Sequence, residues 1–194
     1  MSKENIERQI VYFDSPGKAH TPACLRIARG AIEQYGYKHL IVASTTGETG
    51  VAFSEAFKGG DTRVIVVTHS YGFREANAIE ISPESVEVIR QNGATLYTGT
   101  MITHSLETAL STKSGGMYPA MIVAQALRRF GEGPKVCCEM VMMAADAGLV
   151  PEGGEVVVVA GTGRGADTVM VVRAAASKRF LDLKVLEILA KPRG

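Results

Sequence analysis

The sequence predicts an α/β protein in which helices cover both faces of a mostly parallel sheet, a three-layer α/β/α fold. Segments typical of strands alternate along the chain with segments of helical periodicity. The strand segments are apolar at consecutive positions, as in "GEVVVVAG" (154–161), which indicates burial on both faces. Only a few residues separate 154–161 from the next strand, 167–175. Because a parallel crossover needs a dozen or more residues, these two strands are predicted to form an antiparallel hairpin.

The remaining strands are short apolar runs bounded by turn residues. In chain order, strands are expected at 9–14, 39–44, 62–70, 94–100, 154–161 and 167–175. The C-terminal "LKVLEILAKP" alternates loosely and is a candidate for a last strand.

The helices follow from apolar spacing and from their start and stop residues. Thr21 is the expected N-cap of the first helix, with Pro22 at its first position and Gly36 just after its end. Ser82 and Pro83 begin another helix in the same way. Further helical segments are 51–58, 105–113, 118–130 and 135–147, and residues 71–81 are expected to form a loop.

Composition limits the classes of function. The chain has 194 residues, 46% hydrophobic and 21% charged, with a formal net charge of +1. These values suit one globular domain over 1–194 and give no reason to expect nucleic-acid binding. No run approaches 18 apolar residues, so no membrane segment is expected, and the charged N-terminus gives no reason to expect export. Three cysteines, Cys24, Cys137 and Cys138, form no disulfide or zinc pattern and are expected to be reduced in a cytoplasmic protein.

The strand at 39–44 ends in a small polar loop, "STTGET", that opens a helix. Free N–H groups and the positive dipole end of a helix attract phosphate, and hydroxyl groups add donors. The loop lacks the Gly-Lys-Ser/Thr of the nucleotide hydrolases, so it is not a P-loop. The alternative is a plain helix cap formed by Thr46 or Thr49. The candidate phosphate-binding residues are Ser44, Thr45, Thr46, Gly47, Glu48 and Thr49.

A second glycine-rich segment, "AGTGRGADT" (160–168), matches the string G-x-G-x-x-A but is followed by a strand instead of a helix. It is therefore not a dinucleotide-binding loop. It is expected to be a hairpin turn whose glycines supply positive φ, a flexible lip over the site whose Arg164 can meet an anion, or both. Its candidate ligand-binding residues are Gly161, Thr162, Gly163, Arg164 and Gly165.

Thr-His-Ser occurs twice, at 68–70 and 103–105, each time after a strand. Ligands of open α/β sheets bind at the carboxyl ends of strands, so these residues are candidates for ligand contact. Ser105 is also a candidate helix cap. No third ligand supports a metal site. The candidates from these segments are Thr68, His69, Ser70, Gly72, Phe73, Thr103 and His104.

Two acidic residues, Glu139 and Asp146, interrupt the apolar helix at 135–147 and share one face. Such a face is usually solvated. The alternative is a carboxylate at the ligand site that binds a ring N–H or acts as a base. No nucleophile–base–orienter triad can be recognised, so catalytic residues are left unassigned.

Residues 37–70 resemble the C-terminal domain of pyruvate kinase, and "GTGRGADTVMVV" is similar to the hairpin at the end of that domain. In many pyruvate kinases the first loop grips a phosphate of an allosteric sugar bisphosphate. The resemblance does not extend to the catalytic barrel, so kinase activity is not implied. Nearly the whole chain, including "IVYFDSPGK", "VIVVTHSYGF" and "KVCCEMVMMAADAG", is similar to an archaeal and bacterial family of stand-alone proteins of this kind.

Members of that family bind flavin mononucleotide (FMN) and have no assigned biochemical role. The resemblance implies a mixed five-stranded sheet in the order 3-2-1-4-5, counted from the strand at 39–44, with strand 5 antiparallel and extra terminal strands allowed. "STTGET" and "GTGRGA" would then border the topological switch point of the sheet, the favoured ligand position.

The expected function is FMN binding, with the phosphate on "STTGET" and the ring over the strand ends near Thr68–Phe73 and Thr103–Ser105. The alternatives are a flavin-dependent enzyme, a module that senses a sugar phosphate, and a structural oligomer whose loop merely caps a helix. The expected partner is a small phosphorylated molecule, with no nucleic acid, membrane or metal. The subunit count is open, and a homo-oligomer is allowed.

Overall fold

The structure, a computed structural model, describes Asn5 and residues 7–194. The charged start of the chain, on which the expectation about export depends, lies partly outside the described residues, at 1–4 and 6. The strands are β1 (Val11–Phe13), β2 (His39–Ala43), β3 (Arg63–Thr68), β4 (Thr95–Thr98), β5 (Glu155–Ala160), β6 (Thr168–Arg173) and β7 (Lys184–Pro192). The α-helices are α1 (Thr21–Tyr35), α2 (Glu48–Ala56), α3 (Pro83–Gln91), α4 (Leu106–Ser114), α5 (Pro119–Leu127) and α6 (Glu132–Asp146). Three 3₁₀ helices are η1 (Lys18–His20), η2 (Arg128–Phe130) and η3 (Ser177–Asp182).

The strands form one seven-stranded sheet in the order β1-β7-β6-β5-β2-β3-β4. Its central part, β4-β3-β2-β5-β6, has the order 3-2-1-4-5 expected from the family resemblance. β5 and β6 pair antiparallel, as the short link between them predicts. The C-terminal segment is a strand, β7, which pairs antiparallel with β6 and parallel with β1. The fold class is therefore confirmed, including the terminal strands.

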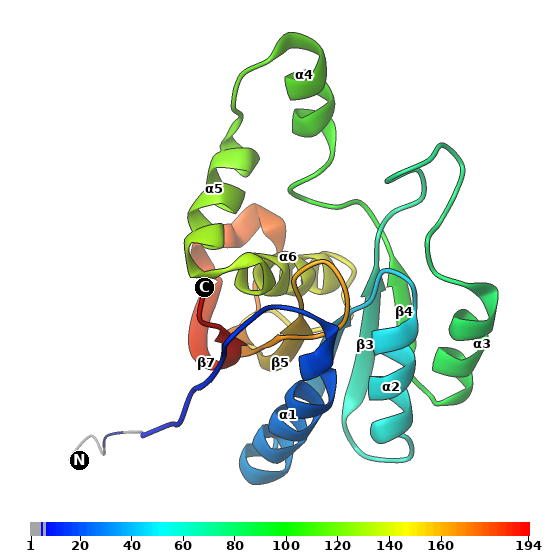
Figure 1. Cartoon of the computed structure of the whole chain (residues 1–194), viewed down its shortest axis with the longest axis vertical. Helices are drawn as coiled ribbons and strands as arrows, with labels where there is room; N and C mark the ends of the chain where they lie inside the picture. Colours follow the sequence, from blue (N-terminus) through cyan, green and yellow to red (C-terminus); the bar gives the residue numbers. More distant parts are fainter. Residues whose placement is uncertain (1–4, 6) are drawn as a thin grey trace.

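Helices cover both faces of the sheet (Figure 1). Side chains alternate across β2, so that Leu40 and Val42 face a core shared with α1, α2 and α3, whereas Ile41 faces α6. α6 brings a dense row of apolar side chains to its face, among them Cys137, Val141 and Met143. α4 stands away from the sheet (Figure 1), and none of its side chains is buried.

The helix ends agree with the sequence at most positions. Ser82 caps α3, because its hydroxyl accepts a hydrogen bond from the Ser85 amide at 3.1 Å. Gly36 closes α1 with a left-handed φ of 72°. The expectation for Thr21 was wrong by one position: α1 already includes Thr21, and its hydroxyl accepts a hydrogen bond from the Ala166 amide at 2.9 Å instead of capping the helix.

The connections around β2 and β5 position the site. These two strands are parallel neighbours. The chain leaves β2 toward α2 on one face of the sheet, whereas α6 lies on the other face and leads into β5. Their carboxyl ends therefore form a topological switch point, where α/β proteins place ligands.

In the part of the chain that the structure describes, no helix has the length and apolar character needed to cross a bilayer.

Candidate functional site

The loop Ser44–Gly47 joins β2 to α2 and leaves helix amides open. Gly47 is the N-cap residue and has a left-handed φ of 102°. The hydroxyl of Ser44 accepts a hydrogen bond from the Gly50 amide at 3.0 Å. No described residue accepts a hydrogen bond from the amides of Glu48 and Thr49, which are the first two of the helix. The alternative of a cap by Thr46 or Thr49 is wrong, since neither side chain caps α2.

Gly47 is required by its surroundings as well as by its backbone. A Cβ at this position would lie 2.2 Å from Cβ of Ser85 in α3. The preceding carbonyl, Thr46 O, accepts a hydrogen bond from the Ser82 amide at 3.4 Å. The loop is thus held against the start of α3, which fixes the direction of its amides.

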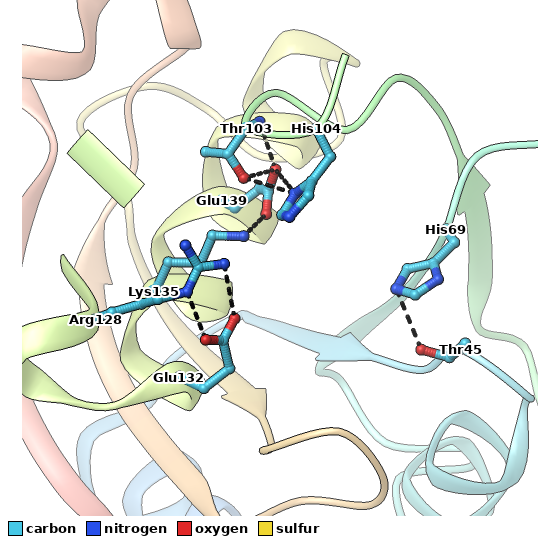
Figure 2. Close-up of polar contacts among 8 residues, drawn as sticks. All are labelled: Thr45, His69, Thr103, His104, Arg128, Glu132, Lys135 and Glu139. Atoms are coloured by element: carbon cyan, nitrogen blue, oxygen red, sulfur yellow. Dashed lines mark hydrogen bonds and ion pairs between the residues drawn. The ribbon is translucent and has the colours of Figure 1, made fainter. Parts of the chain in front are cut away.

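The segment after β3 brings an imidazole beside this loop. His69 Nδ1 lies 2.6 Å from Glu80 Oε2. Figure 2 shows the other side of the ring, where Nε2 lies 3.4 Å from Thr45 Oγ1. The ring also packs on Phe73, with 4.1 Å between centroids, and Arg74 pairs with Glu80 at 2.8 Å. The carboxylate of Glu80 can orient the His69 ring, and the ring can then exchange a proton with a group on the Thr45 side.

A second polar cluster lies on the α6 side of the site (Figure 2). Glu139 is 1% exposed and pairs with Lys135 Nζ at 2.6 Å. Its other oxygen accepts hydrogen bonds from the amide and the hydroxyl of Thr103, at 2.7 and 2.8 Å. His104 Nδ1 lies 2.9 Å from Thr103 Oγ1 and 4.0 Å from Glu139 Oε1. The expectation of a solvated acidic face was wrong for Glu139, whereas Asp146 is exposed.

Glu139 is held ionised by its neighbours. Burial by itself would raise its pKa, but His104, the Lys135 ammonium and the Thr103 amide outweigh burial and lower the pKa to about 2. A carboxylate with so low a pKa is a poor general base at neutral pH.

The hairpin loop between β5 and β6 closes over the switch point. Buried Asp167 accepts hydrogen bonds from the amides of Gly17, at 2.9 Å, and Thr162, at 3.0 Å. Gly163 and Gly165 have positive φ, as predicted for the turn, and a Cβ at Gly165 would lie 2.3 Å from Cβ of Lys18. Asp167 and Gly165 therefore anchor the loop to the N-terminal segment, and the expectation of a flexible lip stays a prediction for its exposed tip, Gly163 and Arg164. Arg164 is exposed and has no carboxylate within ion-pair distance among the described residues.

These segments enclose a cavity of about 360 Å³ at the switch point. It falls within the range of small-molecule sites, near the lower end. The predicted residues that line it are Ser44, Thr45, Thr46, Glu48, Thr49, Thr68, His69, Phe73, His104, Gly161, Gly163, Arg164 and Gly165. Five others, Gly47, Ser70, Gly72, Thr103 and Thr162, lie in the same loops but do not line it.

Most of the α6 wall of the cavity was not predicted from the sequence. Glu132, Lys135, Val136, Glu139 and Met140 all line it. Their spacing is i, i+3, i+4, i+7 and i+8, which is one face of a helix. The signal was present as three charged residues, Glu132, Lys135 and Glu139, that share this helix face with apolar side chains. Other lining residues that were not predicted are Ala43, Val67, Arg74, Glu80 and Met101.

The three cysteines are free and buried, as expected. Burial raises the pKa of Cys24 to about 12 and that of Cys138 to about 11, and it raises the pKa of Cys137 as well. These thiols are therefore protonated at neutral pH and are not nucleophiles. Among the residues described, no three His, Cys, Asp or Glu side chains are grouped so as to hold a metal ion.

Comparison with solved structures finds distant likeness to pyruvate kinases. A pyruvate kinase from Cryptosporidium parvum is 16% identical with a TM-score of 0.45, and the match covers 82% of this chain and 24% of that one. A complex of C. parvum pyruvate kinase with ADP is also 16% identical, with a TM-score of 0.43, covering 83% of this chain and 25% of the other. The chain thus spans about a quarter of the length of these enzymes.

The family model described as "Pyruvate kinase, alpha/beta domain" matches residues 22–172. This range begins in α1, ends in β6, and includes both glycine-bearing loops of the cavity. The chain therefore belongs to the pyruvate kinase alpha/beta domain family.

Proposed function

We propose that the protein binds FMN in this cavity, with the phosphate on the amides at the start of α2. The observation that carries the proposal is the pair of amides, Glu48 and Thr49, that have no acceptor among the described residues and lie at a cavity. The positive end of the α2 dipole adds to their attraction for a doubly charged phosphate. Thr45, Thr46 and Thr49 line the same cavity and can add hydroxyl donors.

Charge around the cavity supports an anion at this end. Glu80, Glu132 and Glu139 line the cavity, and each already has a cationic partner within the protein. Arg164 lines the cavity without such a partner in the described chain, so its guanidinium is available to a phosphate. Glu48 also lines the cavity and has no cationic partner among the described residues, so the proposal requires its exposed carboxylate to turn toward solvent when a phosphate is bound.

The rest of the cavity has the chemistry that a flavin requires. A flat heteroaromatic ring needs apolar contacts on its faces and polar groups at its edge. Phe73, Met101, Val136 and Met140 supply the first, and the two histidines and Lys135 supply the second. The family resemblance found in the sequence favours FMN over other phosphate esters.

The first test is the visible spectrum of freshly purified protein, followed by titration of the flavin-free protein with FMN. We expect FMN to bind and riboflavin, which lacks the phosphate, to bind at least 10-fold more weakly. Replacing Thr46 and Thr49 together by valine should weaken FMN binding by about 100- to 10,000-fold, because each of the two lost hydroxyl bonds to a charged group is worth about 1.5–3 kcal/mol.

The matched control is Thr108→Val with Thr112→Val, which makes the same change on exposed α4, away from the cavity. It should leave FMN affinity unchanged. Equal affinities for FMN and riboflavin, or an unchanged affinity in the Thr46/Thr49 variant, would defeat the assignment of the phosphate to this loop.

A flavin-dependent enzyme is a second candidate, favoured by the position of His69 between Glu80 and Thr45. This arrangement can deliver or remove a proton at the cavity. Steady reduction of bound FMN by a nicotinamide, lost in Glu80→Gln, would support it. Competition of a sugar bisphosphate with FMN would support a regulatory role instead.

A further inference from the structure

Lys135 is a buried cation on the wall of the cavity. It lies one turn into α6, on the face that also carries Glu132, Val136 and Glu139. Its side chain is 1% exposed. Lysine is rarely buried to this extent, because the ammonium loses its hydration, so its partners need to be accounted for in full.

The ammonium of Lys135 has more donors than the protein satisfies. It carries three N–H groups, and one of them donates to Glu139 Oε2 at 2.6 Å. Among the described residues it donates no other hydrogen bond. Glu139 is better satisfied, since its second oxygen receives both the amide and the hydroxyl of Thr103.

Fold stability is a weak explanation for this pair. The attraction between two buried charges often only offsets their loss of hydration, and apolar side chains of similar size serve a core equally well. The neighbours of Lys135 on α6, such as Val136 and Met140, are apolar. A ligand atom that accepts the remaining N–H groups would supply the missing compensation.

The position of Lys135 relative to the phosphate loop defines what kind of ligand this would be. α2 and α6 approach the switch point from opposite faces of the sheet. Figure 2 shows Lys135 and Glu139 on the far side of the site from Thr45 and His69. A group bound by Lys135 is therefore a different part of the ligand from the phosphate.

We propose that Lys135, held in place by Glu139 and Thr103, recognises a second electronegative group at the far end of the ligand. The site would then select phosphate monoesters that carry a hydrogen-bond acceptor at the end opposite the phosphate. Glu139 and Thr103 are positioning residues, and Lys135 is the specificity-determining contact. This inference rests on the proposed function for the phosphate end. With FMN, the acceptors available to Lys135 are the carbonyl oxygens and ring nitrogens of the isoalloxazine.

The test separates the two ends of the ligand. In Lys135→Met with Glu139→Gln, the glutamine oxygen can still accept hydrogen bonds from Thr103 while both charges are removed.

Affinities for FMN and riboflavin are measured by quenching of flavin fluorescence, and the affinity for inorganic phosphate is measured by competition with FMN. We expect the affinities for FMN and riboflavin to fall by the same factor, about 10- to 100-fold, and that for phosphate to stay unchanged. The Thr46/Thr49 variant should do the reverse, weakening FMN and phosphate but not riboflavin.

The matched control is Arg173→Met with Glu155→Gln. It removes an exposed ion pair between the first residue of β5 and the last residue of β6, at the end of these strands away from the cavity. It should leave all three affinities unchanged. Circular dichroism establishes that each variant is folded, and if the double variant is not, Lys135→Gln with Glu139→Gln, which also removes both charges, is measured in its place. The same expectations apply to that variant.

The outcomes distinguish this inference from the proposed function. Tight FMN binding that is equal in the wild type and the Lys135 variant overturns the role of Lys135 and leaves FMN binding intact. If the wild type binds fructose 1,6-bisphosphate but not FMN, the flavin assignment fails. The role of Lys135 is then supported if the variant binds fructose 1,6-bisphosphate more weakly than the wild type, and overturned if the two affinities are equal. A wild type that binds none of these probes overturns both.

Discussion

Glu139 shows how one buried residue can be satisfied on every side. Three donors from Lys135 and Thr103 reach its two oxygens, and His104 lies at 4.0 Å. Glu139 lies in an apolar helix, where a carboxylate without partners would lose its hydration at a large cost in free energy. The partners explain why the group stays ionised although burial opposes its charge.

The pKa of Glu139 makes stability depend on pH. Because the folded pKa, about 2, lies below the value of about 4.3 in an unfolded chain, the stabilisation is present above pH 4.3 and is lost as the pH falls toward 2. The difference between the two values corresponds to about 3 kcal/mol at most. Urea unfolding from pH 7 to pH 2 should show Glu139→Gln less stable than the wild type at neutral pH and nearly equal to it at pH 2. A constant difference across this range would contradict the assignment.

The cysteines provide a second prediction about single residues. Because burial raises their pKa values and excludes solvent, Cys24, Cys137 and Cys138 should not react with a thiol reagent at pH 7.5 in the folded protein. In a denaturant all three should react within seconds to minutes. A thiol that reacts in the folded protein at the unfolded rate would show that its surroundings open to solvent.

At the scale of elements, the start of α2 packs closely against α3 at Gly47. A Cβ at Gly47 would meet Ser85 at 2.2 Å and would also sit at a φ of 102°. Gly47→Ala should therefore destabilise the protein by about 1–3 kcal/mol and weaken ligand binding, because the loop must shift.

Gly59 is the matched control for this change. It also has a positive φ, 73°, but nothing lies within 4 Å of its Cβ position. Gly59→Ala measures the backbone strain without the contact, so the Gly47 variant should be the more destabilised of the two in thermal unfolding. Equal effects would show that the contact with Ser85 does not matter.

The β5–β6 loop is the second element whose anchoring can be tested. Asp167 accepts hydrogen bonds from the half-buried amides of Gly17 and Thr162, and Asp167→Ala would leave both donors without their acceptor. We expect a loss of about 2–4 kcal/mol in the free energy of unfolding. Hydrogen exchange at the Thr162 amide should also become faster, and unchanged exchange would contradict the anchoring role.

For the molecule as a whole, the sequence carried the architecture but only part of the site. The hairpin followed from the length of the link between β5 and β6, and the helices and strands followed from apolar spacing. The strand order of the central sheet depended on the family resemblance, since periodicity does not determine which strands are neighbours. Thr21 was misplaced because the structure uses its hydroxyl for a contact across 145 residues, with Ala166, which no local pattern reveals.

The site divides in the same way. Loops that follow strands could be recognised from small polar residues and glycine, and most of their predicted residues line the cavity. The α6 wall was missed because its polar positions look like the solvated face of an amphipathic helix. Only the packing of α6 against the carboxyl edge of the sheet turns Lys135 and Glu139 toward a cavity.

The most direct measurement of the central claim is the ¹H–¹⁵N correlation spectrum of the flavin-free protein during titration with FMN. We expect the amide resonances of Glu48 and Thr49 to move to lower field as the phosphate accepts their hydrogen bonds, and we expect that riboflavin does not reproduce this shift. Binding of FMN that leaves these two resonances in place would contradict the claim that the start of α2 holds the phosphate.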